Sequence, residues 1–96
     1  MGLAPAIVAD VGATPRVYIN RFSCESEDSA RRLVNTLLVA GLYPELHSPQ
    51  LPGHAWQVVA PVSVVPDRLN LAELDEDMKA AADHAGAVFD GFDPEP

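Results

Sequence analysis

Apolar residues recur at helical spacing in two segments of this 96-residue chain. In the first segment, Ser26 can cap a helix that runs to Gly41, a residue suited to the left-handed backbone at a helix end. In the second, Asn70 and Glu73 can form a capping box, and Gly86 ends the helix. The two apolar stripes consist of Ala30, Leu33, Val34, Leu37 and Leu38, and of Leu71, Leu74, Met78, Ala81, Ala82 and Ala85. The spacing therefore predicts two amphipathic helices.

Four shorter segments have the β-branched, aromatic or alternating composition of strands. They are residues 17–22, 42–46, 56–65 and 87–92. The resulting order, β-α-β-β-α-β, consists of two split βαβ units, and right-handed crossovers place both helices on one face of a four-stranded antiparallel sheet. We therefore expect a ferredoxin-like α+β sandwich over residues 16–96, after a flexible N-terminal arm over residues 1–15. The second sheet face is expected to be open, or covered by the arm or by a second subunit.

The charge of the chain is negative and unevenly distributed. Asp and Glu outnumber Lys and Arg by 14 to 6, which gives a formal charge of −8. Residues 67–96 hold nine acidic and two basic side chains, a net of −7, whereas residues 1–66 hold five and four, a net of −1. Such a charge repels nucleic-acid phosphates and attracts basic partners, so we expect a basic protein segment rather than RNA or DNA as the partner.

The expected location is the cytoplasm. Cys24 is the only cysteine, so no intrachain disulfide can form and a reducing compartment is favoured. No apolar run approaches the roughly 20 residues that span a bilayer, so no membrane contact is expected. The first residues also lack the basic start of a secretory signal.

Metal binding and thiol catalysis are both disfavoured by the placement of the candidate residues. His47, His54 and His84 do not have the close pairwise spacing that fixes two metal ligands on one local frame. Cys24 ends a strand before an acidic turn, which raises a thiol pKa and favours a packed free cysteine over a nucleophile. We expect no metal and no cofactor.

Two groups of residues are candidates for partner binding. Asp75, Glu76 and Asp77 are consecutive, so they point around a helix rather than converging as a general acid–base pair. They form either a solvated helix face or an acidic docking surface. The aromatics expected to lie together are Trp56, Phe89 and Phe92. They form either part of the core or a contact patch on the open sheet face, and the lack of basic residues disfavours RNA stacking there.

The C-terminal run of residues 85–93, Ala-Gly-Ala-Val-Phe-Asp-Gly-Phe-Asp, resembles the end of the RraB family of ribonuclease E inhibitors. That family's end reads approximately Gly-Gly-x-Tyr-Asp-Gly-Trp-Glu. Further matches lie at residues 27–30, 41–43 and 56–58, so the resemblance extends over about residues 20–93. The chain departs from the pattern at Ala85 and at Phe89 and Phe92, which keep an aromatic ring but lose its hydrogen-bonding group.

The RraB resemblance implies a small acidic ferredoxin-like domain that inhibits by binding. Such a protein docks on ribonuclease E away from its catalytic chemistry and alters RNA turnover. A second resemblance, to peptidoglycan-binding SPOR domains, rests on residues 18–22 and 41–44. Those domains lie outside the cytoplasmic membrane on anchored proteins, and the lack of an anchor or signal in this sequence disfavours that assignment.

We therefore expect a non-enzymatic regulator that binds a basic segment of a ribonuclease E-like partner. Acidic side chains would steer and orient that segment, and aromatic rings would supply buried contact area. The expected partner-binding residues are Trp56, Asp75, Glu76, Asp77, Phe89, Asp90 and Phe92. The alternative is a ligand-binding or small-enzyme module on the same fold, including a dimer through the open sheet. A flat acidic surface would favour the regulator, and an apolar pocket with a perturbed His84 or Asp90 would favour the alternative.

Overall fold

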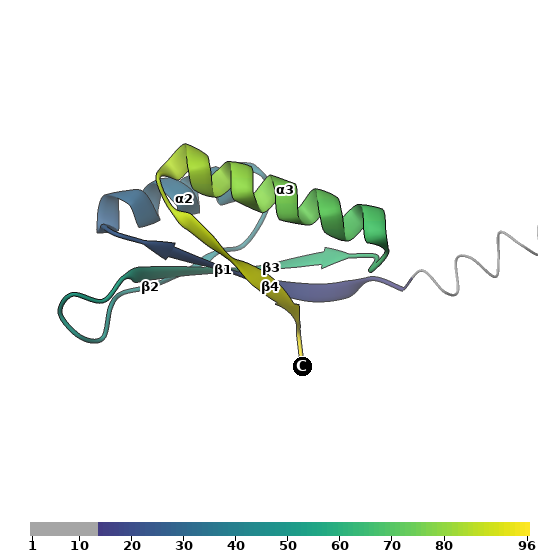
Figure 1. The fold of residues 1–96 in the computed structure, drawn as a ribbon, viewed down its shortest axis with the longest axis horizontal. Helices are drawn as coiled ribbons and strands as arrows, with labels where there is room; N and C mark the ends of the chain where they lie inside the picture. Colours follow the sequence, from purple (N-terminus) through teal and green to yellow (C-terminus); the bar gives the residue numbers. More distant parts are fainter. Residues whose placement is uncertain (1–13) are drawn as a thin grey trace, which may run out of the picture.

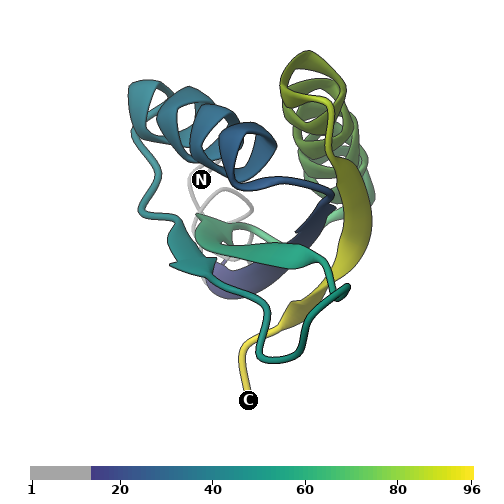
Figure 2. The same ribbon diagram turned by 90° about the vertical axis from the view of Figure 1, so that its left-hand side faces the viewer.

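A computed structural model describes residues 14–96 of the chain. The elements are β1 (Arg16–Cys24), α2 (Glu27–Val39), β2 (Glu45–His47), β3 (Trp56–Val64), α3 (Arg68–Ala85) and β4 (Val88–Pro94) (Figure 1). The four strands form one antiparallel sheet in the order β2-β3-β1-β4. Both helices cover the same face of this sheet (Figure 2). The ferredoxin-like α+β prediction is confirmed, whereas the arm predicted at residues 1–15 lies outside the described residues except for its last two.

The core lies between the helices and the two central strands. Side chains alternate between the two faces of a strand, so every second residue of β1 from Tyr18 to Cys24 is buried beneath the helices. On the neighbouring strand β3, Val58 and Ala60 are fully buried on that same face. Asn20 is the polar exception, and its amide nitrogen donates to the carbonyl oxygen of Ala60 at 3.0 Å.

Helix α2 begins and ends where its sequence predicts. The Ser26 hydroxyl accepts a hydrogen bond from the backbone N–H of Ser29 at 3.1 Å. At the other end, Gly41 adopts a φ of 88° and the N–H of Leu42 reaches back to the carbonyl oxygen of Leu37 at 3.0 Å. This left-handed turn closes the helix. It also delays β2, which was predicted over residues 42–46 and instead covers Glu45–His47.

Helix α3 begins one turn earlier than predicted. Asp67 is its N-cap, and the Asp67 carboxylate accepts the backbone N–H of Asn70 at 2.8 Å. The predicted capping box of Asn70 and Glu73 is therefore wrong. Asn70 lies inside the first turn, where its side-chain amide donates to the carbonyl oxygen of Val65 at 3.1 Å. Gly86 ends the helix with a φ of 72°, as predicted.

The helices are joined at one end and unequal in length. The hydroxyl of Ser29, in the first turn of α2, lies 2.8 Å from the carbonyl oxygen of Ala85 at the end of α3. α2 has 13 residues and α3 has 18, and the two run in opposite chain directions from this junction, so α3 extends past the end of α2 (Figure 1). The helical layer is therefore incomplete over one end of the sheet.

The second face of the sheet is covered by neither helix (Figure 2). Its central positions, Val17, Ile19, Val59 and Pro61, are half-buried, and they are flanked by the exposed Arg21 and Ser63. The expectation that a second subunit covers this face stays a prediction.

Candidate functional site

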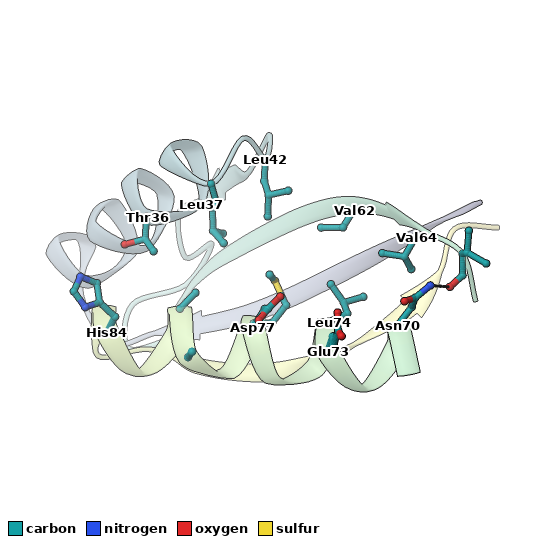
Figure 3. Close-up of a pocket in the computed structure, with 15 residues that line it drawn as sticks. Thr36, Leu37, Leu42, Val62, Val64, Asn70, Glu73, Leu74, Asp77 and His84 are labelled. Carbon is teal, nitrogen blue, oxygen red and sulfur yellow. Dashed lines mark hydrogen bonds between the residues drawn. The ribbon is translucent and has the colours of Figure 1, made fainter. Parts of the chain in front are cut away.

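A groove of about 700 Å³ opens between α2 and α3 and continues past the end of α2. Figure 3 shows Thr36 and Leu37 of α2 across the groove from Leu74 and Asp77 of α3. Its floor is apolar and comes from both helices, from the turn that follows α2 and from β3. The floor residues used below are Leu37, Leu42, Val62, Val64, Leu74 and Met78.

The groove exists because nothing in the helical layer covers the end of β3. Val58 and Ala60 lie under the helices and have no exposed surface. Val62 and Val64 face the same way along the strand but are only half-buried. The exposed apolar surface of the floor is thus a direct result of the shorter α2.

One wall of the groove is polar and belongs to α3. Asn70, Glu73, Asp77 and His84 recur at spacings of three, four and seven residues, which place them on a single side of a helix. That side faces α2 across the groove. Glu73, Asp77 and His84 are exposed, whereas Asn70 is half-buried. The wall therefore sets two solvated carboxylates beside an apolar floor.

The two wall carboxylates form no ion pair with any residue between 14 and 96. The ion pairs in this part of the chain are Arg21–Asp93, Arg31–Glu27 and Lys79–Asp75. All six lysine and arginine residues of the chain fall within these bounds, and none of them forms an ion pair with Glu73 or Asp77. No lysine or arginine among the described residues therefore neutralises these two carboxylates.

The three consecutive acids point in three directions, as their spacing predicts. Asp75 forms an ion pair with Lys79 at 2.8 Å, and this carboxylate raises the pKa of the lysine through its hydrogen bond and its charge. Glu76 is exposed and does not line the groove. Asp77 alone of the three reaches the groove.

Phe89 and Phe92 lie on the helix-covered face of the sheet. The Phe89 ring is 5.2 Å from that of Phe22, and the Phe92 ring is 5.5 Å from that of Tyr18, centroid to centroid. Residues three apart in a regular strand point to opposite faces, but a β-bulge shifts the register here and leaves Asp90 as the extra residue. The bulge turns both rings toward the core, so core packing is their observed role and they form no patch on the open face.

Trp56 is not a neighbour of these two rings. It is opposite Cys24 at the first pair of the β1–β3 ladder, and β1 separates it from β4. The ring–ring contacts within residues 14–96 do not include Trp56, which instead packs half-buried at the margin of the core.

Asp90 and Cys24 lie near one another at the end of β1, away from the groove. The exposed Asp90 carboxylate accepts a hydrogen bond from the Ser23 hydroxyl at 2.5 Å. Burial raises the pKa of the Cys24 thiol, a hydrogen bond with Ser29 lowers it, and the charge of Asp90 raises it further. The net direction is upward, as the sequence predicts.

The histidines are dispersed. His47 and His54 line a small hollow at the β2–β3 connection, and His84 lies in the last turn of α3. Residues 14–96 bring no three metal-ligating side chains together.

Within the same residues, no helix is both long enough and apolar enough to cross a membrane.

The structure thus brings one of the seven expected partner-binding residues, Asp77, to the groove. Sequence reasoning assigned Glu73 to a capping box and Val62 and Val64 to a strand, and it did not connect them. The sequence feature that could have indicated the groove was the unequal length of the two apolar stripes.

Comparisons with protein-family models, with curated proteins and with solved structures found no match to this chain.

Proposed function

We propose that this protein is a cytoplasmic, non-catalytic regulator that binds a basic segment of a protein partner. The groove between α2 and α3 carries the proposal, because it combines an apolar floor with the carboxylates of Glu73 and Asp77, which have no ion pair among the described residues. The RraB resemblance supports a ribonuclease E-like enzyme as the partner and modulation of RNA turnover as the outcome.

The chemistry of the groove favours binding over catalysis. General acid–base catalysis requires a carboxyl group that is withdrawn from water beside one that stays ionised. Glu73 and Asp77 are both exposed, so neither carboxyl group is withdrawn from water. The Cys24 thiol is buried and has a raised pKa, which makes it a poor nucleophile.

The distribution of charge favours a basic partner. The segment with a net charge of −7 contains α3 and β4, so the groove wall belongs to the most negative part of the molecule. A field of one sign accelerates encounter with an oppositely charged partner and is screened over about 8 Å at physiological salt. We therefore expect the association rate to fall as salt is added.

A second candidate function is the binding of a small apolar ligand. The size of the groove favours it, because about 700 Å³ lies within the common range of ligand pockets, roughly 300–1,000 Å³. The groove has a feature of each sequence-based alternative, because its floor is apolar and its α3 wall carries the acidic side chains Glu73 and Asp77.

Binding to the purified ribonuclease E-like enzyme of the same cell tests the proposal. The expected result is saturable binding that weakens as salt rises, together with a slower rate of RNA cleavage. A matched chain carrying Glu73→Lys and Asp77→Lys is expected to lose both effects. Absence of binding at low salt, with both proteins folded, would contradict the proposal.

A further inference from the structure

We infer that the groove accepts an amphipathic α-helix of the partner, which packs beside α3 and places a lysine or arginine against Glu73 and Asp77. The inference rests on the proposed function and specifies the chemistry of the segment that is bound. It follows from three features: the part of the sheet that α2 leaves uncovered, the turn that ends α2 at Gly41, and the carboxylates of Glu73 and Asp77, which form no ion pair among the described residues.

The space beyond the end of α2 and beside α3 is about as long as a short helical segment. Measured from the contact between Ser29 and Ala85, α2 continues for ten residues to Val39 and α3 extends back for seventeen to Arg68, so α3 is longer by seven residues. At about 1.5 Å per residue, this overhang is roughly 10 Å, or about two helical turns. A helix in this space would bury Val62 and Val64 as α2 buries Val58 and Ala60.

The chain cannot close the gap by extending α2. The left-handed Gly41 ends the helix, and the backbone bond from Leu42 to Leu37 turns the chain down toward the sheet. Leu42 then becomes one end of the groove floor. The position that a longer α2 would occupy therefore stays open at the level of the helical layer.

The negative charges of the wall favour a basic side chain in the bound helix. Glu73 and Asp77 are four residues apart on the same side of α3, so one long basic side chain can reach both carboxylates. The apolar floor beside them requires Leu- or Val-like side chains at helical spacing. This pattern, an apolar stripe flanked by a basic residue, is the one that helices bound in grooves present.

A synthetic peptide tests the inference directly on the full chain. The probe is a fluorescein-labelled peptide of about four turns, with leucines at positions i, i+3, i+4 and i+7 and arginines along one edge of the leucine stripe. Two matched peptides have a central proline or glutamates in place of the arginines. We expect fluorescence anisotropy to show at least about tenfold weaker binding of both matched peptides, and circular dichroism to show helix gained by the first peptide on binding.

Two pairs of variants locate the contact. Asp77→Lys and Glu76→Lys make the same change of charge at adjacent exposed positions of α3, but only Asp77 lines the groove. We expect a loss of about tenfold or more for Asp77→Lys and only about twofold for Glu76→Lys, since the latter acts through the long-range field alone.

The second pair tests the floor. Val62→Thr and Val59→Thr replace half-buried valines of the same strand with a residue of the same shape. Val62 faces the groove and Val59 faces the opposite side of the sheet. Weaker peptide binding is expected for Val62→Thr alone.

Several outcomes would overturn the inference. If Asp77→Lys and Glu76→Lys lowered the affinity for the peptide equally, the peptide would be attracted by the charge of the protein without occupying the groove. Equal binding of the proline peptide would show that the occupant is not helical. Binding of monomeric dodecylamine without binding of the peptide would make the groove a small-ligand site. If the ribonuclease E-like partner binds while the peptide does not, the helix inference fails and the proposed function stands; if neither binds, both fail.

Discussion

The hydroxyl of Ser29 lies 2.8 Å from the carbonyl oxygen of Ala85, a residue 56 positions later in the chain. The contact joins the start of α2 to the end of α3 at a point where both helices leave backbone groups without intrahelical partners. The same hydroxyl also lies 3.1 Å from the carbonyl oxygen of Gly86. Because the helices are held together at this end, the overhang of α3 lies at the other end, where the groove between the helices continues past α2.

Replacement Ser29→Ala is expected to lower the free energy of unfolding by about 1–2 kcal/mol, because it leaves a buried carbonyl oxygen without its donor. The N-cap of α2 is retained, since Ser26 accepts from the backbone N–H of residue 29. Urea denaturation followed by circular dichroism measures the change. Ser63→Ala, at an exposed position of β3, is the control and is expected to be neutral.

Replacement Asp67→Ala is expected to lower the free energy of unfolding by about 1 kcal/mol through loss of the α3 N-cap. Glu73→Ala is expected to have little effect, because Glu73 is exposed and does not take part in the cap. Thermal unfolding of the two variants compares them. A larger loss for Glu73→Ala than for Asp67→Ala would support the capping box instead.

Replacement Gly91→Ala is expected to lower the free energy of unfolding by about 1–2 kcal/mol, because Gly91 has a φ of 108° in the bulge of β4. A Cβ atom there would meet no atom within 4 Å, so the loss reflects backbone conformation alone. Near-ultraviolet circular dichroism reports the Phe89 and Phe92 environment, and Val88→Ala, at an exposed position of the same strand, is the control.

The buried Cys24 thiol is expected to react slowly with iodoacetamide at neutral pH and rapidly once the chain is unfolded. Its pKa is raised in the folded state, so the unfolded state ionises first as pH rises. The contribution of this group to stability is therefore complete below the thiol range and is lost as pH rises through it. Urea denaturation as a function of pH measures the loss, and Cys24→Ala is expected to remove this component.

Local signals in the sequence were sufficient to predict most of the fold. Ser26 and Gly41 define α2 because a cap and a left-handed glycine act within a few residues of themselves. The start of α3 was predicted wrongly because Asp67 and Asn70 are both capping residues, and the sequence offers no measure of which one the chain uses. In the folded chain Asp67 accepts the N–H of Asn70, and the Asn70 side chain donates to the carbonyl oxygen of Val65, the residue after β3.

The candidate site was less accessible, because it depends on relations between distant segments. Phe89 and Phe92 are three residues apart, and only the bulge against β1 brings them to one face. Glu73 and Val62 are assigned separately to a helix and a strand by their own neighbours. They line one groove because α2 is shorter than α3, a relation that appears only when the two helices are packed side by side.

The bulge in β4 has a further consequence for how copies of the chain can meet. A long, flat edge strand is a template for another strand, and proteins avoid this growth with short or interrupted edges. In the described sheet, β2 has three residues and β4 is broken at Asp90. Neither edge offers a long unbroken row of amide and carbonyl groups, so the addition of further strands at these edges is disfavoured.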